Sequence, residues 1–277
     1  MIRRRRWTVT LAGLAIAAAP AAAAMTTGAA AGTVAAAPAA HPAVHLTVTH
    51  GPAVRDGLRM VTPGGRAMGT HSRNATATST NWSGYAADSG TYSSVSASWV
   101  QPSVTCGSTA TYSSFWVGLD GYSSNSVEQT GTDSDCSGGS PSYYGWYEMY
   151  PHPSYYFGST VSAGDTMSAS VTFSGTNSYK LTLSDLTKGW SSSTTKKLSN
   201  AARSSAEVII EAPYSGGILP LADFGTVNFS NSLVNGAAIG NTNPVSIDMV
   251  NSSGAYKDQV SSLSGGENFS ATWDRSN

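Results

Sequence analysis

The feature that most constrains this chain is an alternation of apolar and small polar residues, repeated along the sequence after residue 74. Apolar side chains stand at every second position in residues 95–99, 167–173 and 179–183. A period of two places these side chains on one face of a β-strand. Turn-forming glycine and serine residues separate the rows, as in Ser174-Gly175-Thr176-Asn177-Ser178. The pattern predicts an all-β fold of many short antiparallel strands, a barrel or, more in keeping with the length, one large sandwich with a curved sheet.

The charges of this part of the chain narrow the classes of function. Residues 74–277 hold 7 Lys and Arg against 15 Asp and Glu. An acidic surface disfavours nucleic acid as a partner, because phosphate binding needs clustered basic residues. His152 is the one histidine in residues 74–277, which disfavours a Ser-His-Asp site and a multi-histidine zinc site. We expect no cofactor, a fold retained in acid, and lower stability near neutral pH, where the acids repel one another.

The amino-terminal residues 1–24 have the pattern of a signal peptide. Four arginines at 3–6 precede an apolar run over 7–19, and Ala22-Ala23-Ala24 offers a small-residue cleavage site. The run is shorter than the roughly 20 apolar residues of a membrane span. We therefore expect a secreted protein that keeps no membrane segment after cleavage; the alternative is an amino-terminal anchor.

Export would place the chain in an oxidising compartment, where disulfides form and persist. The chain has two cysteines, Cys106 and Cys136. We expect them to pair and to stabilise the fold by about 3 kcal/mol. A catalytic cysteine is the less favoured interpretation, because only His152 is available to activate it.

Residues 25–73 form a basic segment rich in Ala, Pro, Gly and Thr, which predicts a disordered pro-segment or linker before a catalytic domain at 74–277. The segment carries four of the five histidines: His41, His45, His50 and His71. One hypothesis is that it docks on the acidic domain as an inhibitor and leaves on acidification, as histidines gain charge and carboxylates lose it. The alternative is an unstructured leader that any protease trims.

A hydrophobic strand near residue 210 carries two acids. In Ala206-Glu207-Val208-Ile209-Ile210-Glu211, the alternation places Glu207, Ile209 and Glu211 on one face. The functional interpretation is a carboxylate in a cleft, and the alternative is a solvated sheet face. The two Cα atoms would lie roughly 13 Å apart at strand rise, whereas a retaining glycosidase needs carboxyl groups about 5 Å apart.

Five blocks in order carry a resemblance to a known family. They are Asn81-Trp82-Ser83-Gly84, the segments 115–121 and 127–133, Trp146-Tyr147-Glu148-Met149-Tyr150-Pro151, and the strand ending in Glu211 followed by Ala222-Asp223-Phe224-Gly225. Together they resemble the glutamic peptidases (eqolisins), which are secreted acid endopeptidases first known from fungi. The resemblance implies a sandwich of two curved antiparallel sheets with a lectin- or glucanase-like architecture. Fungal members have more cysteines than this chain.

The same resemblance implies a catalytic dyad of Gln129 and Glu211. Glu211 would act as general base and acid on water, and Gln129 would orient the water and stabilise the oxyanion. An ordinary glutamate pKa of about 4.3 would give activity in acid without a histidine. Substrates would be polypeptides, no metal would be needed, and we expect a monomer.

Neighbouring residues of the shared blocks receive weaker assignments. We expect Trp82, Trp116, Tyr147 and Glu148 to line the substrate cleft, with core packing as the alternative for each tryptophan. Asp120, Asp133 and Glu207 would support the dyad, the two aspartates by ordering the loops around Gln129. Two other functions stay open: a sandwich glycoside hydrolase using Glu207 and Glu211, and a non-enzymatic lectin-like module with Asp120 and Asp133 as calcium ligands.

Overall fold

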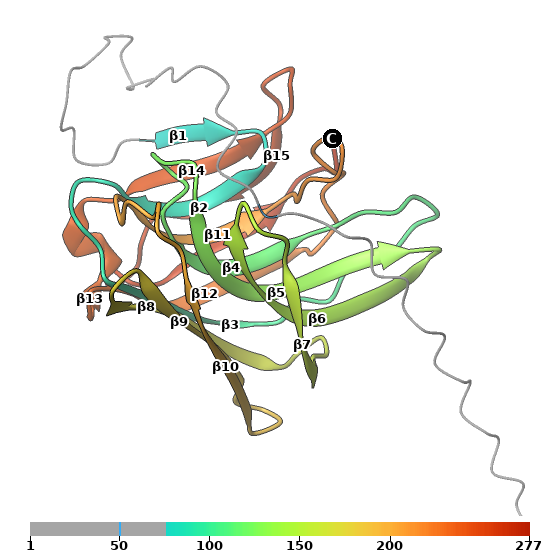
Figure 1. Ribbon diagram of the computed structural model, residues 1–277. Coiled ribbons are helices and arrows are strands. Elements are labelled where there is room, and N and C mark those ends of the chain that lie inside the picture. Colours follow the sequence, from blue (N-terminus) through green and yellow to red (C-terminus); the bar gives the residue numbers. More distant parts are fainter. Residues whose placement is uncertain (1–49, 51–75) are drawn as a thin grey trace, which may run out of the picture. The chain divides into compact units, whose positions relative to one another are not determined.

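The computed structural model describes residue 50 and residues 76–277 (Figure 1). The expected signal peptide, its cleavage site and the boundary at residue 73 lie outside the described residues. Within the described residues, no helix is long and apolar enough to cross a membrane. The elements are β1 (Thr76–Ser79), β2 (Trp82–Ala87), β3 (Ser94–Val100), β4 (Ser114–Leu119), β5 (Val127–Ser137), β6 (Ser140–Tyr150), β7 (Tyr155–Thr160), β8 (Thr166–Gly175), β9 (Ser178–Asp185), β10 (Trp190–Lys197), β11 (Ala206–Glu211), β12 (Thr226–Val234), β13 (Ala237–Ala238), the 3₁₀ helix η1 (Ile239–Thr242), β14 (Val245–Val250), β15 (Tyr256–Val260) and β16 (Phe269–Trp273).

The strands form one hydrogen-bonded sheet with the order β10-β9-β8-β3-β12-β16-β15-β14-β2-β11-β4-β5-β6-β7. Strand β1 adds to β14 in parallel, and β13 adds to β12. The pairs along the main path are antiparallel. Strand β11 lies between β2 and β4, so a segment near residue 210 is placed beside segments near residues 85 and 117.

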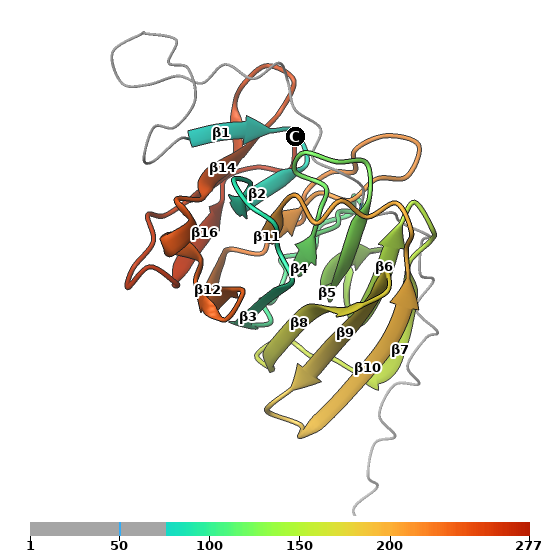
Figure 2. The ribbon, with the colours of Figure 1, turned by 60° about the vertical axis from the view of Figure 1, so that its left-hand side comes forward.

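The sheet doubles over on itself, so that two layers face each other across an apolar core. Strands β8 and β9 contact β4 and β5, and β3 contacts β4 and β11; Figure 2 shows the run β3–β8–β9–β10 beside the run β11–β4–β5–β6. The core between them includes buried side chains from both layers: Val95, Ala97, Trp99, Val117, Leu119, Val171, Leu181, Leu183, Val208 and Ile210. The all-β prediction and the inward-facing rows from the alternation are confirmed.

The connection between the layers differs from the sequence-based expectation. A sandwich of two sheets was expected, whereas the layers are two parts of one continuous sheet that turns through β12, β16, β15 and β14. Register shifts interrupt this turn between Ser230 and Leu233 and between Met249 and Val250. Bulges of this kind bend a strand and increase its twist, which allows the sheet to curl without breaking its ladder.

The predicted disulfide is confirmed. Cys106 and Cys136 are bonded, with Cα atoms 5.4 Å apart and a sequence separation of 30 residues. The bond attaches the segment before β4 to the end of β5, where Thr111 also pairs with Cys136 through the backbone. It therefore braces the far end of the strand that carries Gln129.

Candidate active site

Glu211 lies at the end of β11, on the sheet face turned away from the core. Its neighbours in register are Trp82 on β2 and Ser114 on β4. Glu207 and Ile209 share this face, while Val208 and Ile210 point into the core between the layers. The apolar alternation of this strand therefore fixes the direction in which both acids point.

Gln129 projects from the same face on β5. In register it is opposite Gly118 on β4 and Glu148 on β6. Because Glu211 is opposite Ser114 on β4, the two residues flank β4 and are offset along it by the four positions from Ser114 to Gly118. The Gln129 side-chain amide lies 3.5 Å from Glu148 Oε2. The two residues of the predicted dyad thus lie on the same face of the sheet, on either side of β4.

The environment of Glu211 makes its carboxyl group hard to ionise. The side chain is fully buried, and Trp116 Nε1 donates a hydrogen bond to Glu211 Oε2 at 2.9 Å. Burial raises the pKa of Glu211 well above its ordinary value, and the charge of Glu148 adds to this, while His50 and the Trp116 hydrogen bond act in the opposite direction. The ordinary pKa expected from sequence is therefore not what this enclosed site produces.

Glycines allow the Trp116 indole to lie against the sheet. A Cβ at Gly131 would stand 2.5 Å from Trp116 Cβ and 2.2 Å from the Phe115 carbonyl oxygen. A Cβ at Gly118 would stand 2.8 Å from the Trp116 ring. Heavy atoms do not approach this closely, so neither position has room for a side chain.

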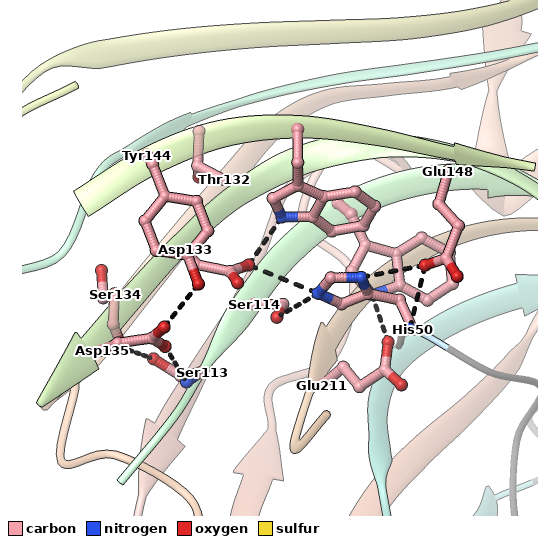
Figure 3. Close-up of polar contacts among 12 residues, drawn as sticks. His50, Ser113, Ser114, Thr132, Asp133, Ser134, Asp135, Tyr144, Glu148 and Glu211 are labelled. Atoms are coloured by element: carbon pink, nitrogen blue, oxygen red, sulfur yellow. Dashed lines mark hydrogen bonds and ion pairs between the residues drawn. The ribbon is translucent and has the colours of Figure 1, made fainter. Parts of the chain in front are cut away.

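His50, which precedes all the described strands in the sequence, occupies the centre of this face. His50 is 1% exposed, and its ring stacks on Trp146 with centroids 3.7 Å apart and planes 6° apart. Its Nδ1 lies 3.0 Å from Glu148 Oε2, and its Nε2 lies 3.1 Å from Ser114 Oγ (Figure 3). The backbone N–H of His50 also donates to Glu148 Oε2 at 2.9 Å.

The main-chain carbonyl of His50 binds the predicted catalytic amide, because Gln129 Nε2 donates a hydrogen bond to His50 O. Asp133 Oδ1 lies 3.6 Å from the ring Nε2. Burial alone would lower the pKa of His50, but the charges and hydrogen bonds of Asp133 and Glu148 outweigh it and raise the pKa to about 10. The bound ring is therefore an imidazolium at neutral and acidic pH.

The two aspartates assigned to support the dyad have different partners. Asp133 Oδ1 accepts a 2.6 Å hydrogen bond from Trp146 Nε1, which holds the ring on which His50 stacks. Asp120 accepts from the backbone N–H groups of Arg203 and Ser204 at 2.7 and 2.8 Å. Asp120 therefore orders the segment that leads into β11, while Asp133 belongs to the site itself.

The other assigned residues divide between the site and its surroundings. Trp82 and Trp116 lie on the site face, edge to face with centroids 4.9 Å apart, and Glu148 contacts His50. Glu207 is opposite Gly118 on β4, and burial raises its pKa well above the ordinary value.

Tyr147 does not belong to this group. It alternates with Glu148 on β6, so its ring lies on the other face of the sheet, where it stacks on Tyr155 with centroids 5.4 Å apart.

Three contributors to this site were absent from the sequence-based assignment: His50 as an occupant, Trp146 and Ser114. A signal for Trp146 was available, because on a strand it shares a face with Glu148, two residues later, whereas Tyr147 does not. Ser114 carried no signal, since the chain is rich in serine.

The described part of the chain contains no group of three or more His, Cys, Asp or Glu side chains arranged to hold a metal ion. Asp120 and Asp133, proposed as calcium ligands in the lectin interpretation, instead accept hydrogen bonds from backbone and indole N–H groups.

An all-β fold that presents a buried glutamine and a buried glutamate on one face agrees with the class of protein that the five sequence blocks resemble. Residues 80–273 match the family described as the Peptidase A4 family. Since this match covers more than half of the sequence, the chain belongs to that family. The resemblance to glutamic peptidases is thereby confirmed.

Two curated relatives are similar in sequence. Aspergillopepsin-2 of Aspergillus niger is 31% identical over 179 residues, which is 56% of this chain and 64% of the relative. Scytalidopepsin B of Scytalidium lignicola is 38% identical over 138 residues, which is 47% of this chain and 51% of the relative. The chain thus spans less than two thirds of the length of either relative.

Solved structures of the family share the fold. Scytalido-glutamic peptidase with a transition state analog inhibitor has a TM-score of 0.63 and 28% identity, covering 70% of this chain and 98% of that one. Aspergilloglutamic peptidase from Aspergillus niger has a TM-score of 0.54 and 30% identity, covering 59% and 99%. A third structure, of SCP-B in a complex with the tripeptide Ala-Ile-His, has a TM-score of 0.59 and 26% identity, covering 70% and 98%.

Proposed function

We propose that this protein is a secreted endopeptidase that hydrolyses peptide bonds in acid with Gln129 and Glu211 as its catalytic residues. The observation that carries the proposal is the hydrogen bond from the Gln129 side-chain amide to a main-chain carbonyl, that of His50, on the face that also presents Glu211. Membership of the Peptidase A4 family supports the same reaction. The relatives' inhibitor and tripeptide complexes support a polypeptide as the substrate.

The chemistry follows from the two groups. Glu211 as carboxylate removes a proton from a water molecule, which attacks the carbonyl carbon, and the same carboxyl then returns the proton to the leaving nitrogen. Gln129 donates its amide hydrogens to the oxygen that becomes negative. Within the described residues, Gln129 Oε1 and Glu211 Oε1 have no hydrogen-bond partner, so both can accept from the attacking water.

Trp116 positions the Glu211 carboxylate and favours its charged form. Its indole N–H binds Glu211 Oε2 and leaves Oε1 to the water. Hydrogen bonding to a carboxylate favours the charged form, so Trp116 offsets part of the effect of burial. Burial is the largest cause of the raised pKa of Glu211, and the charge of His50 acts in the same lowering direction as the Trp116 hydrogen bond.

The test replaces each member of the pair separately. Glu211→Gln and Gln129→Ala are assayed on an unfolded protein substrate in acid, with Glu267→Gln as the control, because Glu267 lies in the β15–β16 connection. We expect turnover to fall by at least about 100-fold in both site variants, the usual scale for general acid–base and oxyanion contributions. Near-wild-type turnover by either variant would refute the assignment.

We also propose that the segment carrying His50 inhibits the enzyme until it is removed. A buried imidazolium between Asp133 and Glu148 closes the face on which substrate must bind. Because the pKa of His50 rises on docking, docking takes up a proton and is favoured as pH falls from about 10 to 6.5. The gain of charge on His50 therefore favours docking and does not itself cause release in acid.

This refines the sequence-based hypothesis, in which the gain of charge on histidine contributed to release. A peptide of residues 25–73 is added to the enzyme lacking that segment, together with peptides carrying His50→Gln or His45→Gln. We expect inhibition near pH 7 by the natural and His45→Gln peptides and weaker inhibition by His50→Gln. Absence of inhibition by the natural peptide at neutral pH would refute docking.

The glycoside hydrolase and lectin alternatives gain no support from the site. Ile209 lies between Glu207 and Glu211 on their shared face, and Gln129 would have no role in sugar hydrolysis. Digestion of protein but not polysaccharide in acid separates the enzymes, and insensitivity to a chelator argues against a calcium lectin.

A further inference from the structure

The main chain of His50 is held in the manner of a substrate. Gln129 Nε2 donates to its carbonyl oxygen, and its N–H donates to Glu148 Oε2 at 2.9 Å. In the proposed reaction, Gln129 binds the oxygen of the carbonyl that water attacks. The residue whose carbonyl it binds is therefore the one immediately before the cleaved bond.

The side chain of that residue enters a pocket suited to an imidazole ring. We define the His50 pocket by Trp146, Ser114, Asp133 and Glu148, each fully buried. Trp146 supplies a flat surface at 3.7 Å between ring centroids, and Glu148 Oε2 and Ser114 Oγ lie 3.0 and 3.1 Å from the two ring nitrogens. Figure 3 shows Asp133 and Glu148 on opposite sides of the ring.

The chemistry of the pocket discriminates among side chains. An aliphatic residue would leave Asp133 and Glu148 buried without a positively charged partner, which is costly because buried charges need pairing. A lysine would supply charge but no flat ring to stack on Trp146. An imidazolium supplies both, with one N–H directed at Glu148 and the other at Ser114 beside Asp133.

We propose that the His50 pocket selects the residue before the cleaved bond, that it prefers histidine, and that the chain's own His50–Gly51 bond is cleaved there. This inference rests on the proposed function. Water adds its oxygen to the His50 carbonyl carbon as the C–N bond breaks. His50 becomes a carboxyl terminus and Gly51 a free amine, with Glu211 carrying the proton from water to nitrogen.

The first experiment follows processing of the full chain. Purified protein is held in acid and its products are read by mass spectrometry, alongside Glu211→Gln, His50→Leu and, as the matched control, His45→Gln. We expect a new amino terminus at Gly51 in the wild type and His45→Gln, at least about tenfold slower cleavage there in His50→Leu, and none in Glu211→Gln. Processing at another bond with His50–Gly51 intact would overturn self-cleavage.

The second experiment measures the preference for histidine with the wild-type enzyme alone, so its result does not depend on whether a variant folds. The processed enzyme is given a peptide of residues 46–55 and the same peptide with leucine at position 50. We expect kcat/KM to be at least about tenfold higher for histidine, the effect of losing one charge-assisted hydrogen bond. Equal kcat/KM values would overturn the proposed preference.

Asp133→Asn tests whether the pocket causes that preference. We expect the ratio of the two kcat/KM values to fall several-fold, and a ratio is insensitive to how much of the variant is folded. An unchanged ratio would exclude Asp133 from selection and overturn the pocket as defined. If the wild type hydrolyses neither peptide nor an unfolded protein in acid, the proposed function itself fails.

Discussion

Glu128 should make this protein less stable as pH rises from acid to neutral. Its side chain is fully buried on β5, and burial together with the nearby charge of Asp120 raises its pKa from 4.5 to about 9. The folded state therefore holds a proton on Glu128 that the unfolded state releases above pH 4.5. Stability from this group is complete below pH 4.5 and is lost progressively as pH rises toward 9.

The magnitude follows from the shift. Each pH unit between the two pKa values costs about 1.36 kcal/mol of unfolding free energy, so the change from pH 4.5 to pH 7 costs roughly 3 kcal/mol. For a domain of this size that corresponds to a fall in Tm of roughly 6–12 °C. Asp258, whose pKa burial raises to about 7, adds to the loss in the same direction.

The assay compares the slope of Tm against pH from 4.5 to 7 in the wild type, in Glu128→Gln and in the exposed control Asp88→Asn. Glutamine keeps the shape and cannot ionise, so any fixed cost of the substitution leaves the slope unaffected. We expect a shallower slope in Glu128→Gln only. Parallel profiles for the wild type and Glu128→Gln, or a wild-type Tm that rises with pH, would refute the reasoning.

Three further outcomes are expected. Trp116→Phe removes the hydrogen bond to Glu211, so the pKa of that carboxyl should rise and the acid limb of the kcat/KM profile should move to higher pH; an unmoved limb contradicts this. Cys106→Ser opens the 30-residue loop and should lower the unfolding free energy by about 3–4 kcal/mol, measured as a lower urea midpoint; an unchanged midpoint contradicts it. His50→Gln in the full chain should weaken self-inhibition, so that the initial rate of hydrolysis of a small peptide, measured before any processing, is higher than in the wild type; equal initial rates contradict it.

The fold was largely predictable because alternation reports burial directly. The rows at 95–99, 167–173 and 179–183 became strands with buried apolar faces. Whether two layers are two sheets or one sheet doubled over depends on bulges such as that near Ser230. A bulge is one extra residue in the pairing of two strands that are distant in sequence. The alternation within a single strand does not reveal it.

The candidate site was predictable in part. Gln129 and Glu211 were assigned from a resemblance, and alternation placed Glu211 on a face with Glu207. The charge contrast between a basic leader and an acidic domain predicted docking, but it did not indicate which histidine docks. His50 is separated from Glu148 by 98 residues, and a contact of that range depends on the completed fold.

The raised pKa of Glu211 could not be predicted from the sequence either. Sequence identifies an acid but not its solvent exposure, and enclosure by Trp116, Trp146 and His50 is a property of the assembled face. The same limit applies to Tyr147, where a block of aromatic residues suggested a cleft wall but the strand direction turned its ring to the opposite side.

The glycines beneath Trp116 have a consequence for which substitutions this protein can tolerate. Any side chain at Gly118 or Gly131 would lift the indole from the sheet and withdraw its N–H from Glu211. The orientation of the base thus depends on two positions that make no contact with a reacting atom. Variants designed to change selectivity should therefore keep glycine at both positions and substitute residues of the His50 pocket instead.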